Sequence, residues 1–250
     1  MLNTLKALVL LLAFAASAAR AELPPDYKMV LLTENFPPFN MAVDDKNFAR
    51  EDAIDGISAD LVREMFKRAQ IDYTLTLRFP WDRLYKLTLD KPNYGLFSTT
   101  FTPERQPLFK WVGPLAKTSW VLLAAPGSRL TVNSLKEAGQ YSIGAYKNDA
   151  VSQHLEGQGL VPVNALRDQE NVKKLTSGKI DLWATTDPVG RYLAKQEGVS
   201  GLITVLRFNE AELYLALNKD TPDEVVQRLQ KALDQLRSEG FVDEMTNSYL

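Results

Sequence analysis

The chain has 250 residues and a formal net charge of −2, from 31 acidic and 29 basic residues, and it contains no cysteine. The lack of cysteine excludes disulfides, thiol catalysis, cysteine-ligated metals and a lipid-modified cysteine, so stability must come from the hydrophobic core. The slight negative charge and the lack of a concentrated basic patch argue against nucleic acid and anionic membrane surfaces as partners.

The first 21 residues are typical of a secretory signal peptide. Lys6 precedes an apolar run over 7–16, and the segment ends in the small-x-small sequence Ala19-Arg20-Ala21. This run is shorter than the roughly 20 residues of a membrane-spanning helix, so we expect cleavage before Glu22, and a retained anchor helix is the alternative. The mature chain, with 27 basic and 31 acidic residues, has a net charge of −4. We expect it in the periplasm, without a lipid anchor.

The first part of the mature chain predicts a strand, a helix and a second strand. The apolar run at 29–34 stops at the turn signal Asn35-Phe36-Pro37-Pro38, and the polar segment 40–55 is expected to be exposed. Helical spacing of apolar residues follows over 57–70, and alternation over 74–79 indicates a strand. This order is that of a βαβ unit.

Hydroxyl side chains and a proline follow the next predicted strand. A helix is predicted over 81–90, and the apolar stretch 94–97 leads into the segment STTFTPER at 98–105. We expect Pro103 to be the first residue of a helix, which would place free backbone N–H groups beside the hydroxyls. Anions bind well at such a place.

The alternation continues to the end of the chain. Further strands are predicted at 119–126, 141–146, 160–165, 179–185, 202–208 and 212–219. Further helices are predicted at 134–139, 149–159, 168–178, 188–198 and 222–241, followed by a short polar tail. Such alternation predicts parallel or mixed sheets with helices on both faces, and therefore the α/β class.

This distribution favours two lobes, the second inserted into the first. Lobe 1 is expected to comprise 22–116 plus 212–250, and lobe 2 to comprise 117–211. Apolar strands near 120–125 and 212–217 would carry the chain across and act as a hinge. Ligands of α/β proteins collect at the carboxyl ends of strands, which would face the cleft between such lobes.

Several short motifs resemble family 3 of the bacterial solute-binding proteins, the amino-acid-binding type that serves ATP-driven importers. They are Phe36-Pro37-Pro38-Phe39, GISADL at 56–61, STTFTPER at 98–105, GAYKNDA at 144–150, GKID at 178–181 and the terminal segment 219–240. Each motif is weak alone, but their order and spacing span the mature chain. The resemblance implies a periplasmic-binding-protein-like fold, with two α/β lobes joined by a two-strand hinge around a ligand cleft.

The resemblance implies two aromatic contacts with the ligand. Phe36, in the Pro-Pro turn, holds the place of an aromatic that packs on the ligand, and Trp81 holds that of a second aromatic facing the cleft. Tryptophan suits this role because it offers a large flat surface with two torsions to freeze. Ordinary core packing is the alternative for both residues.

The resemblance also implies an anion pocket at 98–105. Arg105 would grip the ligand carboxylate through its planar fork, with the hydroxyls of Ser98 and Thr100 completing the pocket. The alternative is that Arg105 caps its own helix or forms a surface ion pair.

The chain departs from the family pattern at two places in the second lobe. Asn148 replaces the usual glycine, and Asp149 replaces a threonine that touches the carboxylate, so Asp149 either caps a helix or faces a positive group. Thr186 stands where the family has the aspartate for the ligand ammonium, and Asp187 follows it. Either Asp187 has taken over that role or it starts a helix before Pro188.

The leading functional hypothesis is therefore passive capture of a small carboxylate-bearing ligand, such as an amino acid, by hinge closure. The partner would be an ABC permease of the inner membrane, or alternatively a membrane sensor. A dehydratase-like enzyme on the same fold needs a carboxylic acid of tuned pKa in the cleft, for which Asp149 and Asp187 are the candidates. No cofactor or metal motif is visible, His154 is expected to be a surface or packing residue, and we expect a monomer.

Overall fold

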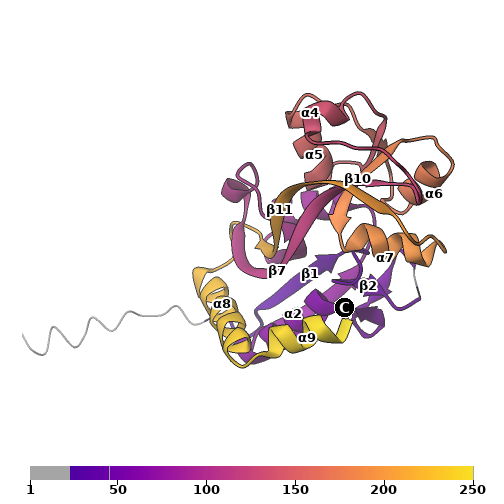
Figure 1. The fold of residues 1–250 in the computed structure, drawn as a ribbon. Helices are drawn as coiled ribbons and strands as arrows, with labels where there is room; N and C mark the ends of the chain where they lie inside the picture. Colours follow the sequence, from indigo (N-terminus) through magenta and orange to yellow (C-terminus); the bar gives the residue numbers. More distant parts are fainter. Residues whose placement is uncertain (1–22, 45, 250) are drawn as a thin grey trace, which may run out of the picture.

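The computed structural model describes residues 23–44 and 46–249, so the predicted signal peptide lies outside the described residues. The chain forms a mixed sheet of nine strands in the order β3-β5-β1-β6-β11-β7-β10-β8-β9, with helices packed on it (Figure 1). The predicted α/β class is confirmed. No helix in this described part is long and apolar enough to cross a membrane.

The element boundaries follow the hydrophobic patterns of the sequence. The strands are β1 (Lys28–Thr33), β2 (Met41–Ala42), β3 (Ala49–Arg50), β4 (Ile54–Asp55), β5 (Asp72–Leu77), β6 (Tyr94–Thr100), β7 (Lys110–Ala124), β8 (Ile143–Tyr146), β9 (Val163–Ala165), β10 (Leu182–Asp187) and β11 (Ile203–Leu217). The α-helices are α2 (Ile57–Ala69), α3 (Trp81–Asp90), α4 (Leu135–Ala138), α5 (Ala150–Gly157), α6 (Glu170–Thr176), α7 (Val189–Gln196), α8 (Asp223–Ser238) and α9 (Phe241–Tyr249). Two 3₁₀ turns, η1 (Glu51–Ala53) and η2 (Gln106–Leu108), complete the set.

Two long antiparallel strands hold the sheet together. β7 and β11 pair from Ala124 opposite Ile203 to Lys110 opposite Leu217. β6 pairs with the last part of β11, and β10 pairs with the last part of β7, so each half of the sheet is built on a different end of the same ribbon. Figure 1 shows the two halves, with α2, α8 and α9 on one and α4, α5 and α6 on the other.

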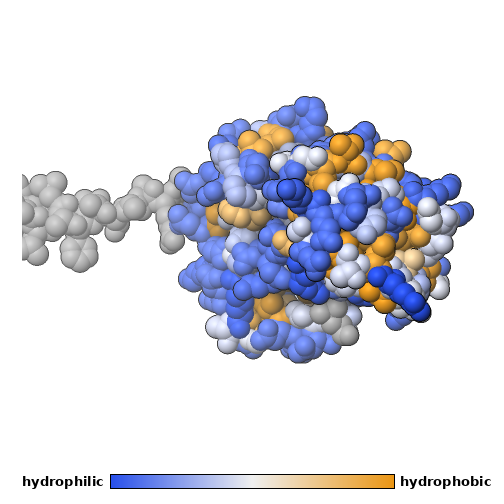
Figure 2. All heavy atoms as spheres, turned by 45° about the horizontal axis from the view of Figure 1, so that its top comes forward, coloured by the Kyte–Doolittle hydropathy of each residue, from blue (hydrophilic) through white to orange (hydrophobic). Residues whose placement is uncertain are grey.

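Each half has its own core. In the half that contains β1, the apolar faces of α2 and α8 pack on the sheet, and side chains such as Leu61, Phe66 and Leu229 are fully buried. In the other half, the core around Leu155 lies on α5 and the strands beneath it. The cluster around Trp183 lies on α6 and α7 and also includes Phe39 and Ile57 of the first half, so it joins the two halves. The surface seen in Figure 2 is mainly hydrophilic, broken by patches of hydrophobic residues.

Three predictions about secondary structure are wrong. Residues 202–208 and 212–219, predicted as two strands, belong mainly to the single strand β11, because Asn209 and Glu210 between the two apolar runs pair with Trp120 and Ser119 of β7. The predicted polar tail is helix α9. Pro103 does not begin an α-helix: the chain forms turns and then η2, because Pro107 has no N–H to continue a helix and β7 begins at Lys110.

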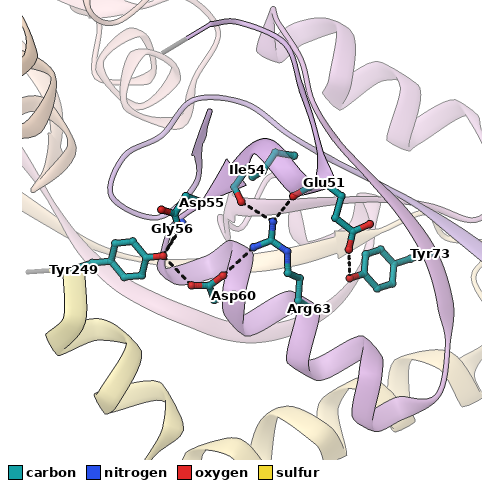
Figure 3. Close-up of polar contacts among 8 residues, drawn as sticks. All are labelled: Glu51, Ile54, Asp55, Gly56, Asp60, Arg63, Tyr73 and Tyr249. Atoms are coloured by element: carbon teal, nitrogen blue, oxygen red, sulfur yellow. Dashed lines mark hydrogen bonds and ion pairs between the residues drawn. The ribbon is translucent and has the colours of Figure 1, made fainter. Parts of the chain in front are cut away.

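A polar cluster fastens α9 to the start of α2 (Figure 3). The Tyr249 hydroxyl forms hydrogen bonds with the carboxylates of Asp55 and Asp60, and it accepts one from the Gly56 N–H at 3.2 Å. Asp60 also pairs with Arg63 at 2.8 Å. These contacts of the hydroxyl fix the last helix against the first half, and the Tyr249 ring also packs against the cluster that joins the two halves.

We expect Tyr249→Phe to lower the free energy of unfolding by about 1 kcal/mol, since it removes hydrogen bonds from a half-buried hydroxyl and keeps the ring. For a chain of this size the melting temperature should fall by about 2 to 4 °C, measured by differential scanning calorimetry. Ser248→Ala, which removes an exposed hydroxyl from the same helix, is the matched control and should leave the melting temperature unchanged. Equal melting temperatures for wild type and Tyr249→Phe would contradict this role.

Candidate functional site

A small cavity of about 30 Å³ lies between the two halves of the sheet. Its lining comes from the carboxyl ends of β1 and β6, the start of α3, the β8–α5 turn and the end of β10. Seven of the nine predicted site residues line this cavity: Phe36, Trp81, Ser98, Thr100, Arg105, Asp149 and Thr186. Asn148 and Asp187 are not among its lining residues.

Arg105 is buried in this cavity, with 4% of its surface exposed. Its guanidinium carbon lies 5.8 Å from the ring centre of Trp81 and 5.3 Å from that of Tyr85. The group donates hydrogen bonds to two neutral acceptors, the Thr100 carbonyl and the Gln153 side chain, and Nε is buried without a partner. Among the described residues, no carboxylate forms an ion pair with Arg105 within 4.0 Å.

The hydroxyl pocket differs in detail from the expectation. Ser98 adopts a φ of 56°, which is unusual for a residue with a side chain, and its hydroxyl donates to Asn40 Oδ1. Asn40 in turn donates from Nδ2 to the Glu34 carbonyl at 2.6 Å. Ser98 therefore already has a protein partner, while Thr100 supplies its carbonyl to Arg105.

The two predicted aromatics occupy different places. Trp81 is the first residue of α3, packs with Leu84 and Tyr146, and presents its ring to Arg105. Phe36 lies in the Pro-Pro turn and stacks on Phe39 with ring centres 5.9 Å apart. Each is thus both a packing residue and a lining residue of the cavity.

A glycine fixes the position of the Phe36 turn. Gly56, at φ +122°, lies against the Phe39 carbonyl, and a Cβ atom there would be 2.5 Å from that oxygen. Any other residue at this position would push the turn away from α2.

The acidic residues of the second half have structural partners. Asp149 caps α5, because its carboxylate accepts the Ser152 N–H at 2.7 Å. Burial raises the pKa of Asp149 to about 7. Asp187 lies at the end of β10 and forms ion pairs with Arg191 at 3.5 Å and Arg207 at 3.3 Å, and α7 begins two residues later.

Sequence reasoning missed Glu34 and Tyr146, which face each other across the cavity. Glu34 is 7% exposed, and its Oε2 accepts the Tyr146 hydroxyl at 2.8 Å. Burial raises the pKa of Glu34 to about 8, against the lowering effect of Tyr146, and the charges of Asp149 and Asp168 add to the rise. The sequence held one signal for Glu34: it follows the predicted strand that became β1, and α/β proteins bind ligands at the carboxyl ends of their strands.

Asp168 was also missed. It lies just before α6 and lines a second cavity of about 60 Å³ beside the first. Its carboxylate accepts hydrogen bonds from Trp183 Nε1, Thr185 Oγ1 and Asn171 Nδ2, at 2.8, 2.7 and 3.1 Å. Burial raises the pKa of Asp168 and these three donors lower it. Among the residues described, no group of acidic or histidine side chains is arranged to hold a metal ion.

Polar contacts join the two halves across the cleft. Besides Tyr146 to Glu34, Asn148 Nδ2 donates to Asp82 at 2.7 Å, and Arg105 donates to Gln153 at 3.1 Å. These contacts connect the two sides of the cleft in the described structure. Asn148, absent from the cavity lining, acts as one of these bridges.

Comparisons with known proteins agree with this architecture. A family model, bacterial extracellular solute-binding proteins, family 3, matches residues 29–250. None of the curated proteins compared with the chain matches it.

Solved structures with similar folds include binding proteins and a sensor. A histidine kinase sensor domain with similarity to periplasmic binding proteins has a TM-score of 0.78 and 15% identity, covering 89% of this chain and 96% of that one. The arginine-, lysine-, histidine-binding protein ArtJ from Geobacillus stearothermophilus has a TM-score of 0.76 and 22% identity, covering 89% and 95%. The ancestral amino acid-binding protein AncCDT-1, a precursor of cyclohexadienyl dehydratase, has a TM-score of 0.73 and 16% identity, covering 89% and 94%.

At these identities the structures show the fold, which is that of the periplasmic binding proteins. The family model covers nearly all of the described chain, and the cavity lies between the two halves that this fold predicts. The chain therefore belongs to family 3 of the bacterial extracellular solute-binding proteins.

Proposed function

We propose that this protein captures a small polar ligand bearing a carboxylate, such as an amino acid, in the periplasm and delivers it to an ABC importer. The observation that carries the proposal is Arg105, a buried guanidinium without an ionic partner among the described residues. A buried charge without a paired counter-charge is costly, and the charges of Asp149 and Glu104 only partly offset the burial of Arg105. The site therefore favours an anion that enters it.

The surroundings of Arg105 suit a carboxylate. Trp81 and Tyr85 flank the planar fork, which limits the directions in which its N–H groups point. A carboxylate can accept two parallel hydrogen bonds from such a fork.

Closure of the two lobes is the proposed working motion. We place the lobes at 22–116 plus 212–250 and at 117–211, with β7 and β11 as the hinge. Arg105 belongs to the first lobe and Asp149 and Thr186 to the second, and all three line one cavity. A ligand that touches both sides favours the closed state by its differential affinity.

A membrane sensor is the second candidate partner, and the similarity to a histidine kinase sensor domain supports it. The importer rests on the sequence resemblance to the type of solute-binding protein that serves ATP-driven importers, and the likeness to the amino-acid-binding protein ArtJ supports an amino acid as the ligand. Catalysis is the weaker alternative: Glu34, a buried acid with a raised pKa, meets its chemical requirement better than Asp149 or Asp187. A passive binder releases its ligand chemically unchanged. Mass spectrometry of the ligand before binding and after elution therefore distinguishes binding from catalysis.

We expect Arg105→Ala to lower the affinity for a carboxylate ligand by about 100-fold, because two charge-assisted hydrogen bonds are lost. The refolded, ligand-stripped protein is screened by thermal unfolding against amino acids, dicarboxylates, polyamines and small sugars. A ligand at 100 times its Kd raises the free energy of unfolding by about 2.7 kcal/mol. Arg105→Lys should recover only part of the affinity, and Arg129→Ala, an exposed arginine, is the control. Unchanged affinity in Arg105→Ala overturns the anion site.

Ligand binding should shorten the distance between the lobes. The chain has no cysteine, so spin labels at Lys86→Cys and Gln158→Cys, two exposed positions on α3 and just after α5, report that distance. Electron paramagnetic resonance should show a broad distribution without ligand and a shorter, narrower one with it. A single unchanged distribution would exclude hinge closure.

Deletion of the gene should abolish uptake of the identified ligand, measured with labelled compound in cells of the source organism, and Arg105→Ala should fail to restore it. Normal uptake together with a lost transcriptional response to the ligand would instead assign the protein to a sensor.

A further inference from the structure

Tyr146 is carried by the second half of the sheet but packs in a core cluster of the first half. It is the last residue of β8 and is 9% exposed. The other buried members of its cluster all lie on β1, β6 and α3 of the first half, and they are Leu32, Trp81, Leu84 and Leu96. Within the described chain, the clusters around Leu155 and Trp183 do not include Tyr146. This side chain therefore joins the core of the half to which it does not belong.

The Tyr146 hydroxyl also finds its partners in the first half. It donates to Glu34 Oε2 at 2.8 Å and accepts the backbone N–H of Trp81 at 3.4 Å. Trp81 begins α3, so this N–H is one of the donors that the first turn of a helix leaves without a partner inside the helix. One side chain of the second half thus combines apolar packing with two hydrogen bonds across the cleft.

The other polar bridges across the cleft are open to water. Asn148 donates to Asp82, and Gln153 accepts from Arg105. Asn148, Asp82 and Gln153 are all exposed. Exposed hydrogen bonds add little net free energy because water competes for both partners, whereas the burial of an aromatic ring does not face this competition. Tyr146 is therefore the bridge that contributes most to the contact between the halves.

All of these contacts of Tyr146 are made by the protein itself. They form when the halves approach each other, and they are lost when the halves separate, because the partners lie across the cleft. Separation returns the ring to water, which costs free energy in proportion to the apolar area exposed. The balance between separated and joined halves therefore contains a contribution that does not depend on a ligand.

We propose that Tyr146 is a latch between the two lobes, which keeps a fraction of the protein closed before any ligand enters. Closed means here the arrangement in which Tyr146 makes the contacts described above. This inference rests on the lobe motion of the proposed function, but it does not depend on the anion site. The apparent affinity for a ligand that needs the closed arrangement rises with the fraction already closed, so the latch adjusts affinity through this equilibrium.

The test measures the distance between the lobes in ligand-stripped protein, with no ligand added. Spin labels at Lys86→Cys and Gln158→Cys report this distance by double electron–electron resonance. Protein with Tyr146 intact should show a component at the distance expected from the described arrangement. Tyr146→Ala should lower the ratio of this closed component to the open one by at least about 10-fold. Truncation of a buried aromatic anchor at an interface commonly costs more than the roughly 1.4 kcal/mol that corresponds to tenfold.

Two further variants separate the latch from a general loss of stability. Tyr141→Ala is the matched control, because Tyr141 packs against the Leu155 cluster, whose members all lie within 117–211, and it should leave the ratio unchanged. Tyr146→Phe keeps the ring and loses the hydroxyl, so it should lower the ratio by about 3- to 10-fold, as expected for one hydrogen bond. Circular dichroism checks that each variant is folded, and Tyr146→Phe alone decides the question if Tyr146→Ala does not fold.

Three results would overturn the latch. They are a ligand-stripped protein without the closed component, a ratio that the Tyr146 variants leave unchanged, and an equal fall of the ratio in Tyr141→Ala. Failure of the anion site has a different signature, which is unchanged ligand affinity in Arg105→Ala, and it leaves the ligand-free distances as they are.

Discussion

The pairing of β7 with β11 is the constraint on which the rest of the structure depends. These two strands form the centre of the sheet, and the strands of each half attach to opposite ends of the same ribbon. Every polar group of the cleft is positioned relative to this ribbon, either from β1 and β6 on one side or from β8 and β10 on the other. In the proposed hinge motion, a bend or twist of the ribbon changes the distance between the two sets.

The cleft combines groups that are costly to bury with a closed geometry. Arg105 has no ionic partner among the described residues, Glu34 has one hydrogen bond, and both are almost fully buried. In a folded protein such groups are stabilised when an oppositely charged group reaches them. The carboxylate of the proposed ligand would pair with Arg105, whose Nε is buried without a partner, and its binding would be coupled to the loss of water from the cleft.

Much of the fold was predictable because its helices and strands show clear hydrophobic periods. Helices α2 and α3 and strand β1 lie within a residue or two of the prediction, and Trp81 and Arg105 could be placed because short motifs mark their positions. Glu34 has no such motif: a glutamate after an apolar run looks like the exposed end of a strand, and only the tertiary fold reveals that Tyr146 covers it.

The remaining misses also have tertiary causes. Helix α9 is polar over much of its length and is held by Tyr249 against Asp55 and Asp60, residues almost 200 positions earlier in the chain. Strand β11 was divided in prediction because Asn209 and Glu210 interrupt its apolar pattern. Its pairing with β7 overrides that local preference.

The order of strands in the sheet has a consequence for how the chain folds. β6 and β7 follow each other in sequence, yet β11 lies between them in the sheet. The half containing β7, β8, β9 and β10 can form much of its sheet from contacts within residues 119–187. The half containing β1 cannot close until β11 arrives from more than 100 residues further on, and such distant contacts slow folding. The inserted half is therefore expected to acquire protection from hydrogen exchange first during refolding.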